Sequence, residues 1–512
     1  MRRPIFFVVA ALVPLLLYAR TATYGFVHAD DADLIAGNQP FLSALGNVPR
    51  AFARSYFEVE GDLTAQKTYY RPVAIVSFML DAARSGDDPR GYHLTNIVLH
   101  SVATCLLLAL ALAWGAPAWA AFVGAILFAV HPVNVQAVAW IAGRNDLLLA
   151  VFGLLSLIAW TKGALGVGSL GVGGWAWLGV HTAAFALALF SKETGLFFPV
   201  LAVLHQSFVQ RARPSRAQWV ALAADAAVVV AWAVLRANAL GQSSELTLRS
   251  IQIAVVNLPQ VLLHAGKMLA PVRLNVAPGV DAIGAIVGAV AVALFFLLVP
   301  KREAIAAAVW ALAFLLPTLL VPGLPAYEHR AYVPMIGVLL AVMGRLPPSP
   351  SLRRPGKPAT MYVVMAVFLA VTVARQPVFH DAFAYWTDAA KDPQFGPIAN
   401  VNLGQLYEGE GRLADARREY LRALERNPDT PKAHNDLGVV LMKLEEPELA
   451  LTHFREEARR HPWNADAWYN LGLFEEIRGD SAAARRYYER AIAENRAFLP
   501  AYEKLGLTPR RN

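Results

Sequence analysis

Cysteine and charge are both scarce in this sequence. Cys105 is the single cysteine among 512 residues, so no intrachain disulfide can form. Charged residues make up 16% of the chain, whereas about a quarter is usual in soluble globular proteins. Neither a P-loop nor the G-x-S-x-G elbow of serine hydrolases occurs, which argues against an NTPase and against a Ser-His-Asp hydrolase. Hydrophobic residues, by contrast, account for 56% of the chain, a share that favours a membrane protein.

The hydrophobic residues are gathered into blocks that carry few charges. About eleven blocks have the length and composition of helices that cross a hydrocarbon core of about 30 Å at 1.5 Å per residue. They centre on residues 5–18, 94–114, 118–130, 147–161, 175–190, 196–209, 219–237, 282–299, 305–320, 333–343 and 361–373. The sequence therefore predicts an all-α fold that begins with a polytopic membrane helix bundle of about eleven spans.

The basic residues predict which side of the membrane each loop faces. The net charge is +8, and the arginines and lysines that flank the blocks gather at the N-terminus and in three loops. These residues are Arg2, Arg3, Arg211, Arg213, Arg216, Lys301, Arg302, Arg353, Arg354 and Lys357. Such loops are typical of the cytoplasmic side. Block 5–18 is then a span rather than a cleaved secretory signal, and the C-terminal domain lies outside.

The segment 251–276 is apolar but does not fit this topology as a further span. Counting it would move two of the basic loops to the outside, against the positive-inside rule. It also contains two prolines and several polar residues. We therefore expect an interfacial or re-entrant helix on the outer side. The long first outer loop, residues 19–93, is expected on the same side.

From residue 397 onward the chain is polar and repeats every 34 residues, the length of a tetratricopeptide repeat. A Leu-Gly pair, an alanine and an aromatic residue recur in register. They are Leu403-Gly404, Leu437-Gly438, Leu471-Gly472 and Leu505-Gly506, then Ala416, Ala450 and Ala484, then Tyr420, Phe454 and Tyr488. We expect a membrane domain over 1–375, a linker over 376–396 and a tetratricopeptide-repeat (TPR) α-solenoid over 397–512, with three repeats and a partial fourth. Its concave face is predicted to bind a protein or peptide, with no individual residue indicated.

Ionisable residues crowd the outer ends of the predicted spans, where polar groups are costly and mark functional sites. Four clusters qualify: His28 to Asp33 with Tyr70-Arg71-Pro72 and Tyr92-His93 in the first outer loop, His131 to Asp146, Ser191-Lys192-Glu193, and Glu328-His329-Arg330. Each cluster alone is compatible with a solvated loop or a simple ion pair. Together they place carboxylates, histidines and cations on one face of the membrane.

These residue types are the parts of a transferase that uses a lipid-phosphate donor. A carboxylate can take the proton of an acceptor hydroxyl as that oxygen attacks an anomeric carbon. Arginine and lysine can hold the phosphate and stabilise the charge that develops on it. Metal ligation by His28, Asp30 and Asp31 is conceivable, but their tight spacing on a loop is a weak signal. No cofactor is otherwise indicated, and no metal site is predicted.

At these residues the chain resembles the transmembrane and tetratricopeptide-repeat O-mannosyltransferases, and more broadly the polytopic glycosyltransferases of the GT-C fold. The resemblance covers nearly the whole length. It is carried by the stretches 26–31, 70–72, 92–96 and 131–146, by Ser191 to Gly195, by Glu328 to Pro334 and by the repeats. Gln136 departs from it, because a glutamate is expected there.

The resemblance implies transfer of a sugar, plausibly mannose, from a polyprenyl- or dolichyl-phosphate donor to an acceptor outside the membrane. Asp31, or else Asp30, is then the catalytic base, and Arg144, Lys192 and Arg330 are candidate contacts of the donor phosphate. The supporting residues are His28, Arg71, His93, His131, Asp146, Glu193, Glu328 and His329. Composition further suggests a bacterial inner membrane with a periplasmic repeat domain.

Two alternatives stay open at this point. The acceptor is a protein in the main hypothesis, but a lipid or a cell-wall glycan serves the same chemistry. The chain is also compatible with a non-catalytic membrane-anchored TPR scaffold whose outer charges bind lipid head groups. The expected partners are thus a polyprenyl-phosphate-linked sugar, membrane lipid and a protein or peptide, but no nucleic acid.

Overall fold

A computed structural model describes residues 3–27, 29–58, 69–166, 172–241, 248–271, 273–321, 325–346 and 357–508. Every regular element in these ranges is a helix. The chain divides into two compact units. The first runs to Asp381 and the second begins at Ala382, although the short segment Ala277–Gly279 groups with the second. The prediction of an all-α chain with a membrane bundle and a repeat domain is confirmed.

All eleven apolar blocks fold as helices of the first unit. They are α1 (Arg3–Tyr18), α6 (Pro89–Ala113), α7 (Ala118–Val130), α9 (Arg144–Gly166), α10 (Val172–Ser191), α11 (Phe198–Leu204) with the π-helix η6 (His205–Val209), α12 (Arg216–Leu240), α15 (Ala282–Leu298), α16 (Lys301–Leu319), α17 (Tyr332–Met343) and α18 (Lys357–Arg375). Seven of the helices in the described ranges are long and apolar enough to cross a membrane, and the other apolar helices are shorter. The chain is therefore an integral membrane protein.

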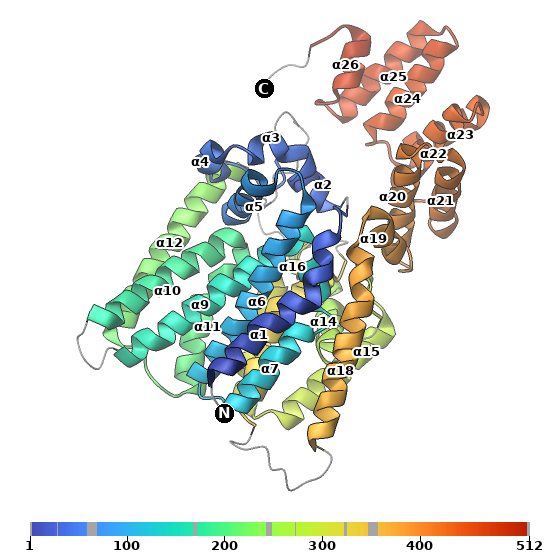
Figure 1. Ribbon diagram of the computed structural model, residues 1–512. Coiled ribbons are helices and arrows are strands. Elements are labelled where there is room, and N and C mark those ends of the chain that lie inside the picture. The colour runs from blue at the N-terminus through green and yellow to red at the C-terminus, as the bar shows by residue number, and fades with distance from the viewer. Residues whose placement is uncertain are drawn as a thin grey trace. The chain divides into compact units, whose positions relative to one another are not determined.

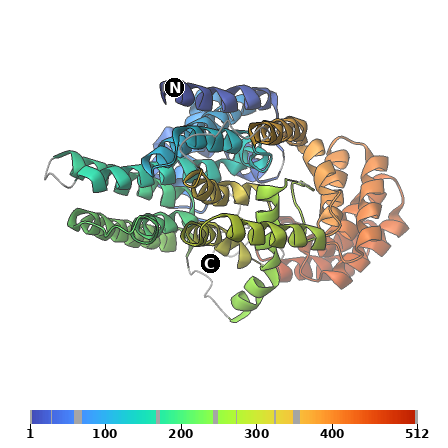
Figure 2. The ribbon, with the colours of Figure 1, turned by 90° about the horizontal axis from the view of Figure 1, so that it is seen from below.

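The long helices run alongside one another in the first unit (Figure 1). Viewed from below, α1 lies at one edge of this unit and α12 at the opposite edge (Figure 2). In the apolar window of α12 only 11% of the residues are buried, against 89% in that of the segment Ile141–Gly163, most of which is α9. Hence α9 is the centre of the bundle and α12 is a peripheral helix.

Short helices form the long connection between α1 and α6, which the sequence predicts as the first outer loop. They include α2 (Asp30–Leu34), α3 (Gln39–Leu42), α4 (Val48–Ala51) and the longer α5 (Pro72–Ser85). A second region of short helices, α8 (Asn134–Ala139) and η4 (Ile141–Gly143), connects α7 to α9 and is fully buried. These connections carry most of the polar clusters, and the spanning helices hold them in place.

The segment 251–276 does not form one continuous helix. It contains most of α13 (Leu248–Asn257, 10 residues) and α14 (Pro259–Leu269, 11 residues), with Pro259 at the start of the second. Each helix is far shorter than the roughly 20 residues that a transmembrane helix needs. Placement of this segment at the outer surface of the membrane stays a prediction.

The second unit contains the repeats as helix pairs. The pairs are α20 (Gly396–Gly409) with α21 (Leu413–Arg426), α22 (Ala433–Lys443) with α23 (Pro447–Arg460), and α24 (Ala465–Ile477) with α25 (Ser481–Glu494), followed by α26 (Leu499–Leu505). A Cβ atom added at Gly438 would lie 2.6 Å from the ring of Phe454, which explains why glycine and an aromatic residue recur together. The segment 376–396, expected as a linker, contains η8 (Gln376–Phe379) and α19 (Ala382–Ala389), and α19 packs on α20.

Candidate functional site

A cavity of about 500 Å³ in the first unit brings together seven of the residues predicted from sequence. They come from five separate places in the chain: Asp30 at the start of α2, Arg71 just before α5, Asp146 in the first turn of α9, Lys192 and Glu193 after α10, and His329 and Arg330 in η7 (Glu328–Ala331). Positions as far apart as 30 and 330 thus line one space. Three of these side chains are cations and three are carboxylates.

Two of the cations are held by two of the carboxylates. Arg71 donates to Glu193 through Nε at 3.1 Å and through a terminal nitrogen at 2.8 Å, a bidentate pair. Lys192 Nζ lies 2.7 and 2.9 Å from the two oxygens of Asp146. Burial alone lowers the pKa of Arg71, but the Glu193 carboxylate outweighs it and raises that pKa. Both pairs therefore fix charged groups at the cavity wall.

Arg330 is the third cation and is held differently. Its guanidinium lies 5.1 Å from the centre of the Tyr327 ring and donates to the Pro325 carbonyl at 3.3 Å. In the described parts of the chain, no carboxylate pairs with it. Burial lowers the pKa of this guanidinium, yet arginine remains charged at physiological pH. Arg330 is thus a cation with its charge available to a ligand of the cavity.

Asp30 and Asp31 have different surroundings. Asp30 is partly exposed and lines the cavity. Asp31 is 1% exposed and does not line it; its two oxygens accept backbone N–H groups of Val27 at 3.2 Å and of Ala142 at 3.0 Å. Burial raises the pKa of Asp31 to about 7, against the effect of these two bonds. The geometry therefore favours Asp30 over Asp31 as the base, the reverse of the order expected from sequence.

Arg144 lies away from the cavity, although it was expected to contact the donor phosphate. Its side chain is completely buried and pairs with Asp81 of α5 at 2.5 Å. It also donates to Asn96 Oδ1 at 2.8 Å and to the Tyr92 carbonyl at 2.7 Å. Through these contacts Arg144, which belongs to α9, connects that helix to α5 and α6. The sequence analysis missed Asp81, whose only signal is a carboxylate inside an otherwise apolar helical face.

The predicted histidines of the first two clusters serve as buried connections. His93 Nε2 lies 3.5 Å from the Gly25 carbonyl, and His131 Nε2 lies 3.0 Å from the Met268 carbonyl. Burial lowers the pKa of His131 to about 4, so this ring is neutral. Neither histidine lines the cavity. His28 lies outside the described residues.

Glu328 is likewise a structural residue. It is fully buried, accepts the backbone N–H of Asn275 at 2.7 Å and lies 3.4 Å from Arg375 and 3.8 Å from Lys267. This carboxylate connects the segment after α14, the end of α18 and η7. It thereby positions the neighbouring His329 and Arg330, which do line the cavity.

Aromatic side chains complete the cavity wall and were not predicted as site residues. They are Phe57, Tyr69, Trp140, Phe314 and Tyr327. Aromatic residues are common throughout the apolar blocks, so their number gives no signal; of these five, Trp140 lies inside the stretch 131–146 that the sequence analysis had noted. Thr194 also lines the cavity; it lies inside the stretch Ser191 to Gly195, but a single hydroxyl there gives no signal of its own. In the described ranges, no three His, Cys, Asp or Glu side chains cluster as metal ligands.

Comparison with known proteins bears on both units. The tetratricopeptide repeat family matches residues 379–431, 401–462 and 435–500. Protein O-mannosyl-transferase tmtc2 of Xenopus laevis is 32% identical over 198 residues, which is 38% of this chain and 23% of that protein. Protein O-mannosyl-transferase Tmtc2 of Drosophila melanogaster is 31% identical over 183 residues, 35% of this chain and 19% of that protein. Over these parts of its length the chain is similar to protein O-mannosyl-transferases.

The match covers less than a quarter of the length of either O-mannosyl-transferase. Among solved structures, ArnT from Cupriavidus metallidurans bound to undecaprenyl phosphate aligns with 92% of this chain and 80% of its own, at 15% identity and a TM-score of 0.42. A score of this size does not establish a shared fold. The assignment to the GT-C fold therefore stays a prediction.

Gln136 is the position at which a glutamate is expected in the O-mannosyl-transferase family. Its side chain is fully buried, donates to the Val276 carbonyl at 2.9 Å and accepts the backbone N–H of His329 at 3.1 Å. An ionised carboxylate could accept the His329 N–H but could not donate to the Val276 carbonyl. The amide thus suits a position that holds a carbonyl and an N–H together, and it supports η7 at the edge of the cavity.

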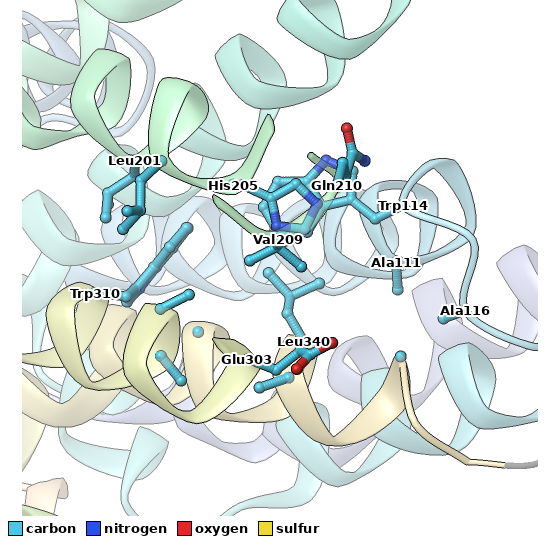
Figure 3. A pocket seen from close by; sticks show the side chains of 16 residues that line it. Ala111, Trp114, Ala116, Leu201, His205, Val209, Gln210, Glu303, Trp310 and Leu340 are labelled. Carbon is cyan, nitrogen blue, oxygen red and sulfur yellow. The ribbon is translucent and has the colours of Figure 1, made fainter. Parts of the chain in front are cut away.

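A second cavity of about 240 Å³ lies between the other ends of the helices and contains none of the predicted site residues. Figure 3 shows the His205 ring beside Trp114, with Trp310, Leu340 and Glu303 on the surrounding walls. The rings of Trp114 and His205 are stacked, with their centres 3.4 Å apart. Its walls come mainly from η6, α11, α16 and α17, and one carboxylate, Glu303, lines it. None of the predicted site residues lines this second cavity, whereas seven of them line the larger one.

Proposed function

We propose that the larger cavity transfers a sugar from a polyprenyl-phosphate donor to an acceptor hydroxyl. One observation carries the proposal: Asp30 shares a single cavity with three cations, Arg71, Lys192 and Arg330, at the ends of membrane-spanning helices. A carboxylate suits proton removal, and the cations suit a phosphate. The names of the homologous O-mannosyl-transferases make mannose the proposed sugar and a protein the proposed acceptor.

In the proposed reaction, Asp30 takes the proton of the acceptor hydroxyl while that oxygen forms a bond to the anomeric carbon. The bond between the anomeric carbon and the phosphate oxygen breaks, and its electron pair leaves with the polyprenyl phosphate. Arg330 stabilises the negative charge that develops on this phosphate, because its guanidinium has no carboxylate partner among the described residues. Polyprenyl phosphate and the glycosylated acceptor are the products.

The two ion pairs of the wall have a supporting role in this proposal. Lys192 and Arg71 each keep a carboxylate partner, so each pair contributes less net charge than Arg330 does. The two pairs orient the N–H groups of Lys192 and Arg71 toward the phosphate of the lipid and set the width of the cavity. The donor's polyprenyl tail is proposed to lie along the apolar surface of α16, whose Leu312 and Leu316 are about half exposed.

The cavity and the repeats are proposed to face the periplasm of a bacterial inner membrane, with the N-terminus in the cytoplasm. The concave face of the repeats would then deliver a protein acceptor to the cavity side. A reporter that is active only in the cytoplasm, fused after Asn512, is expected to be silent. Activity of that fusion would overturn the orientation.

The proposed activity is tested with the purified full-length chain in vesicles that contain labelled polyprenyl-phosphate mannose and an envelope-protein extract. We expect label in protein with wild type and a loss of about 10² to 10⁴-fold with Asp30→Asn. The isosteric amide keeps the size of the side chain and removes the base. The matched control is Asp392→Asn, since Asp392 belongs to the second unit. Label that enters lipid alone would shift the acceptor class, and equal labelling by wild type and Asp30→Asn would remove the proposed catalyst.

A further inference from the structure

Two neutral polar side chains on the cavity wall are buried without using their hydrogen-bonding atoms. Thr194 is 3% exposed and His329 is 9% exposed, and both line the cavity. Thr194 Oγ1 and His329 Nδ1 find no hydrogen-bond partner among the described residues. An unsatisfied buried polar group costs about 1–3 kcal/mol, so such groups are uncommon unless a ligand or water meets them. Their place on the cavity wall points to a ligand.

His329 is a neutral group in spite of its position between cations. Burial, with Lys192 and Arg330 nearby, lowers its pKa well below the usual value. Its backbone N–H is held by Gln136 at 3.1 Å, which fixes the ring against the cavity. A neutral imidazole can donate or accept one hydrogen bond at Nδ1 but offers no charge to a phosphate. It therefore suits a hydroxyl group.

Aromatic rings surround these two polar atoms. The His329 ring stacks on Tyr327 with ring centres 5.4 Å apart and an angle of 27° between the planes. Trp140 lies 5.3 Å from His329, and all three rings line the cavity. Specific small-molecule sites combine such apolar walls with a few placed polar groups. A sugar ring has both features that this wall would meet, apolar C–H faces and hydroxyl groups at its edge.

We infer that Thr194, His329, Trp140 and Tyr327 form the subsite for the sugar ring of the donor, separate from the cations that meet its phosphate. The inference rests on the proposed function and adds the residues that select the sugar. In this arrangement the aromatic rings contact a C–H face of the sugar. Thr194 Oγ1 and His329 Nδ1 each bond a sugar hydroxyl, while Arg330 contacts the phosphate.

The test compares the binding of two lipids by the purified full-length chain: polyprenyl phosphate and polyprenyl-phosphate mannose. Thr194→Val keeps the shape of the side chain and removes its one hydrogen-bonding atom, and His329→Phe keeps an aromatic ring but removes both ring nitrogens. We expect each variant to weaken binding of the mannosyl lipid by roughly tenfold and to leave binding of polyprenyl phosphate within about twofold. Retained binding of the second lipid also reports that the variant is folded.

Two further variants serve as references. Thr318→Val alters another threonine of the same wall, but the Thr318 hydroxyl donates to the Leu315 carbonyl at 2.6 Å, so binding of both lipids should stay near wild type. Arg330→Gln should weaken both lipids together, because they share the phosphate. Wild-type affinity of Thr194→Val and His329→Phe for the mannosyl lipid, or an equal loss of both lipids, overturns the sugar subsite. A wild-type chain that binds neither lipid overturns the proposed function itself.

Discussion

Neighbouring residues with the same side chain have different roles at the edge of the cavity. Asp30 and Asp31 are the first two residues of the five-residue helix α2, so their side chains point in different directions. Asp30 lines the cavity, whereas Asp31 accepts hydrogen bonds from the backbone of Val27 and Ala142. The sequence identifies this pair of carboxylates as a candidate site. It does not identify which of them faces the cavity, because that depends on how α2 packs against η4.

Asp31→Ala is expected to destabilise the protein, although it changes none of the residues that line the cavity. The change leaves two buried N–H groups without their acceptor, at a cost of about 1–3 kcal/mol for each group. Because burial raises the pKa of Asp31 to about 7, the wild-type carboxyl gives most stability when it is protonated and loses it as the pH rises through that value. Thermal unfolding in detergent should therefore show a gap between wild type and variant that narrows as the pH rises from about 4 to about 7 and stays constant above that. A gap that widens with pH would contradict this.

Replacement by glutamine is expected to have opposite effects on folding at Arg144 and at Arg330. Arg144→Gln breaks a fully buried ion pair with Asp81 and should cost about 3–5 kcal/mol, seen as loss of folded protein. Arg330→Gln should leave the amount of folded protein unchanged and lower donor binding. Size-exclusion profiles of the detergent-solubilised variants distinguish the two. Normal folding of Arg144→Gln together with a selective loss of donor binding would restore Arg144 as a phosphate contact.

At the scale of helices, a polar chain inside the bundle holds the peripheral α12. Ser156 of α9 lies 2.8 Å from His181 Nδ1 of α10, and His181 Nε2 lies 2.9 Å from Asp225 of α12. All three side chains are buried, while most of α12 is exposed. These residues line neither of the two cavities described above, and we assign them to helix association rather than to catalysis.

Asp225→Ala should therefore weaken the packing of α12 on α10. A hydrogen bond between transmembrane helices contributes about 1–2 kcal/mol, so the midpoint of thermal unfolding should fall. Asp225→Asn retains an oxygen that faces His181, so its midpoint of thermal unfolding should lie between those of Asp225→Ala and wild type. Equal midpoints for wild type and Asp225→Ala would show that α12 is held by apolar packing alone.

In the repeats, the 34-residue period reports a close contact between paired helices. A Cβ at Gly438 would lie 2.6 Å from the buried Phe454 ring, so Gly438→Ala should destabilise the second unit by about 1–3 kcal/mol. Gly409→Ala is the matched control, since a Cβ there meets nothing within 4 Å. Thermal unfolding followed by circular dichroism compares the two. A midpoint for Gly438→Ala at or above that of the control would contradict the packing argument.

For the whole molecule, the fold was more accessible from the sequence than the site. The apolar blocks and the Leu-Gly register are local patterns, and each corresponds to a helix at the expected place. The pairing of Lys192 with Asp146, or of Arg71 with Glu193, depends instead on how distant helices pack. Hydropathy carries no information about that packing. For the same reason the sequence does not reveal that Arg144 pairs with Asp81, because a cation at the end of a span looks alike whether it faces a cavity or another helix.

The central claim is that the cavity containing Asp30 transfers sugar to protein outside the membrane. Mass spectrometry of envelope proteins tests it most directly, in cells that lack this chain and are rescued with wild type or with Asp30→Asn at equal abundance. The account predicts a hexose-sized mass on envelope proteins that wild type restores and Asp30→Asn does not. Identical glycan profiles in the three strains, or full restoration by Asp30→Asn, would contradict it.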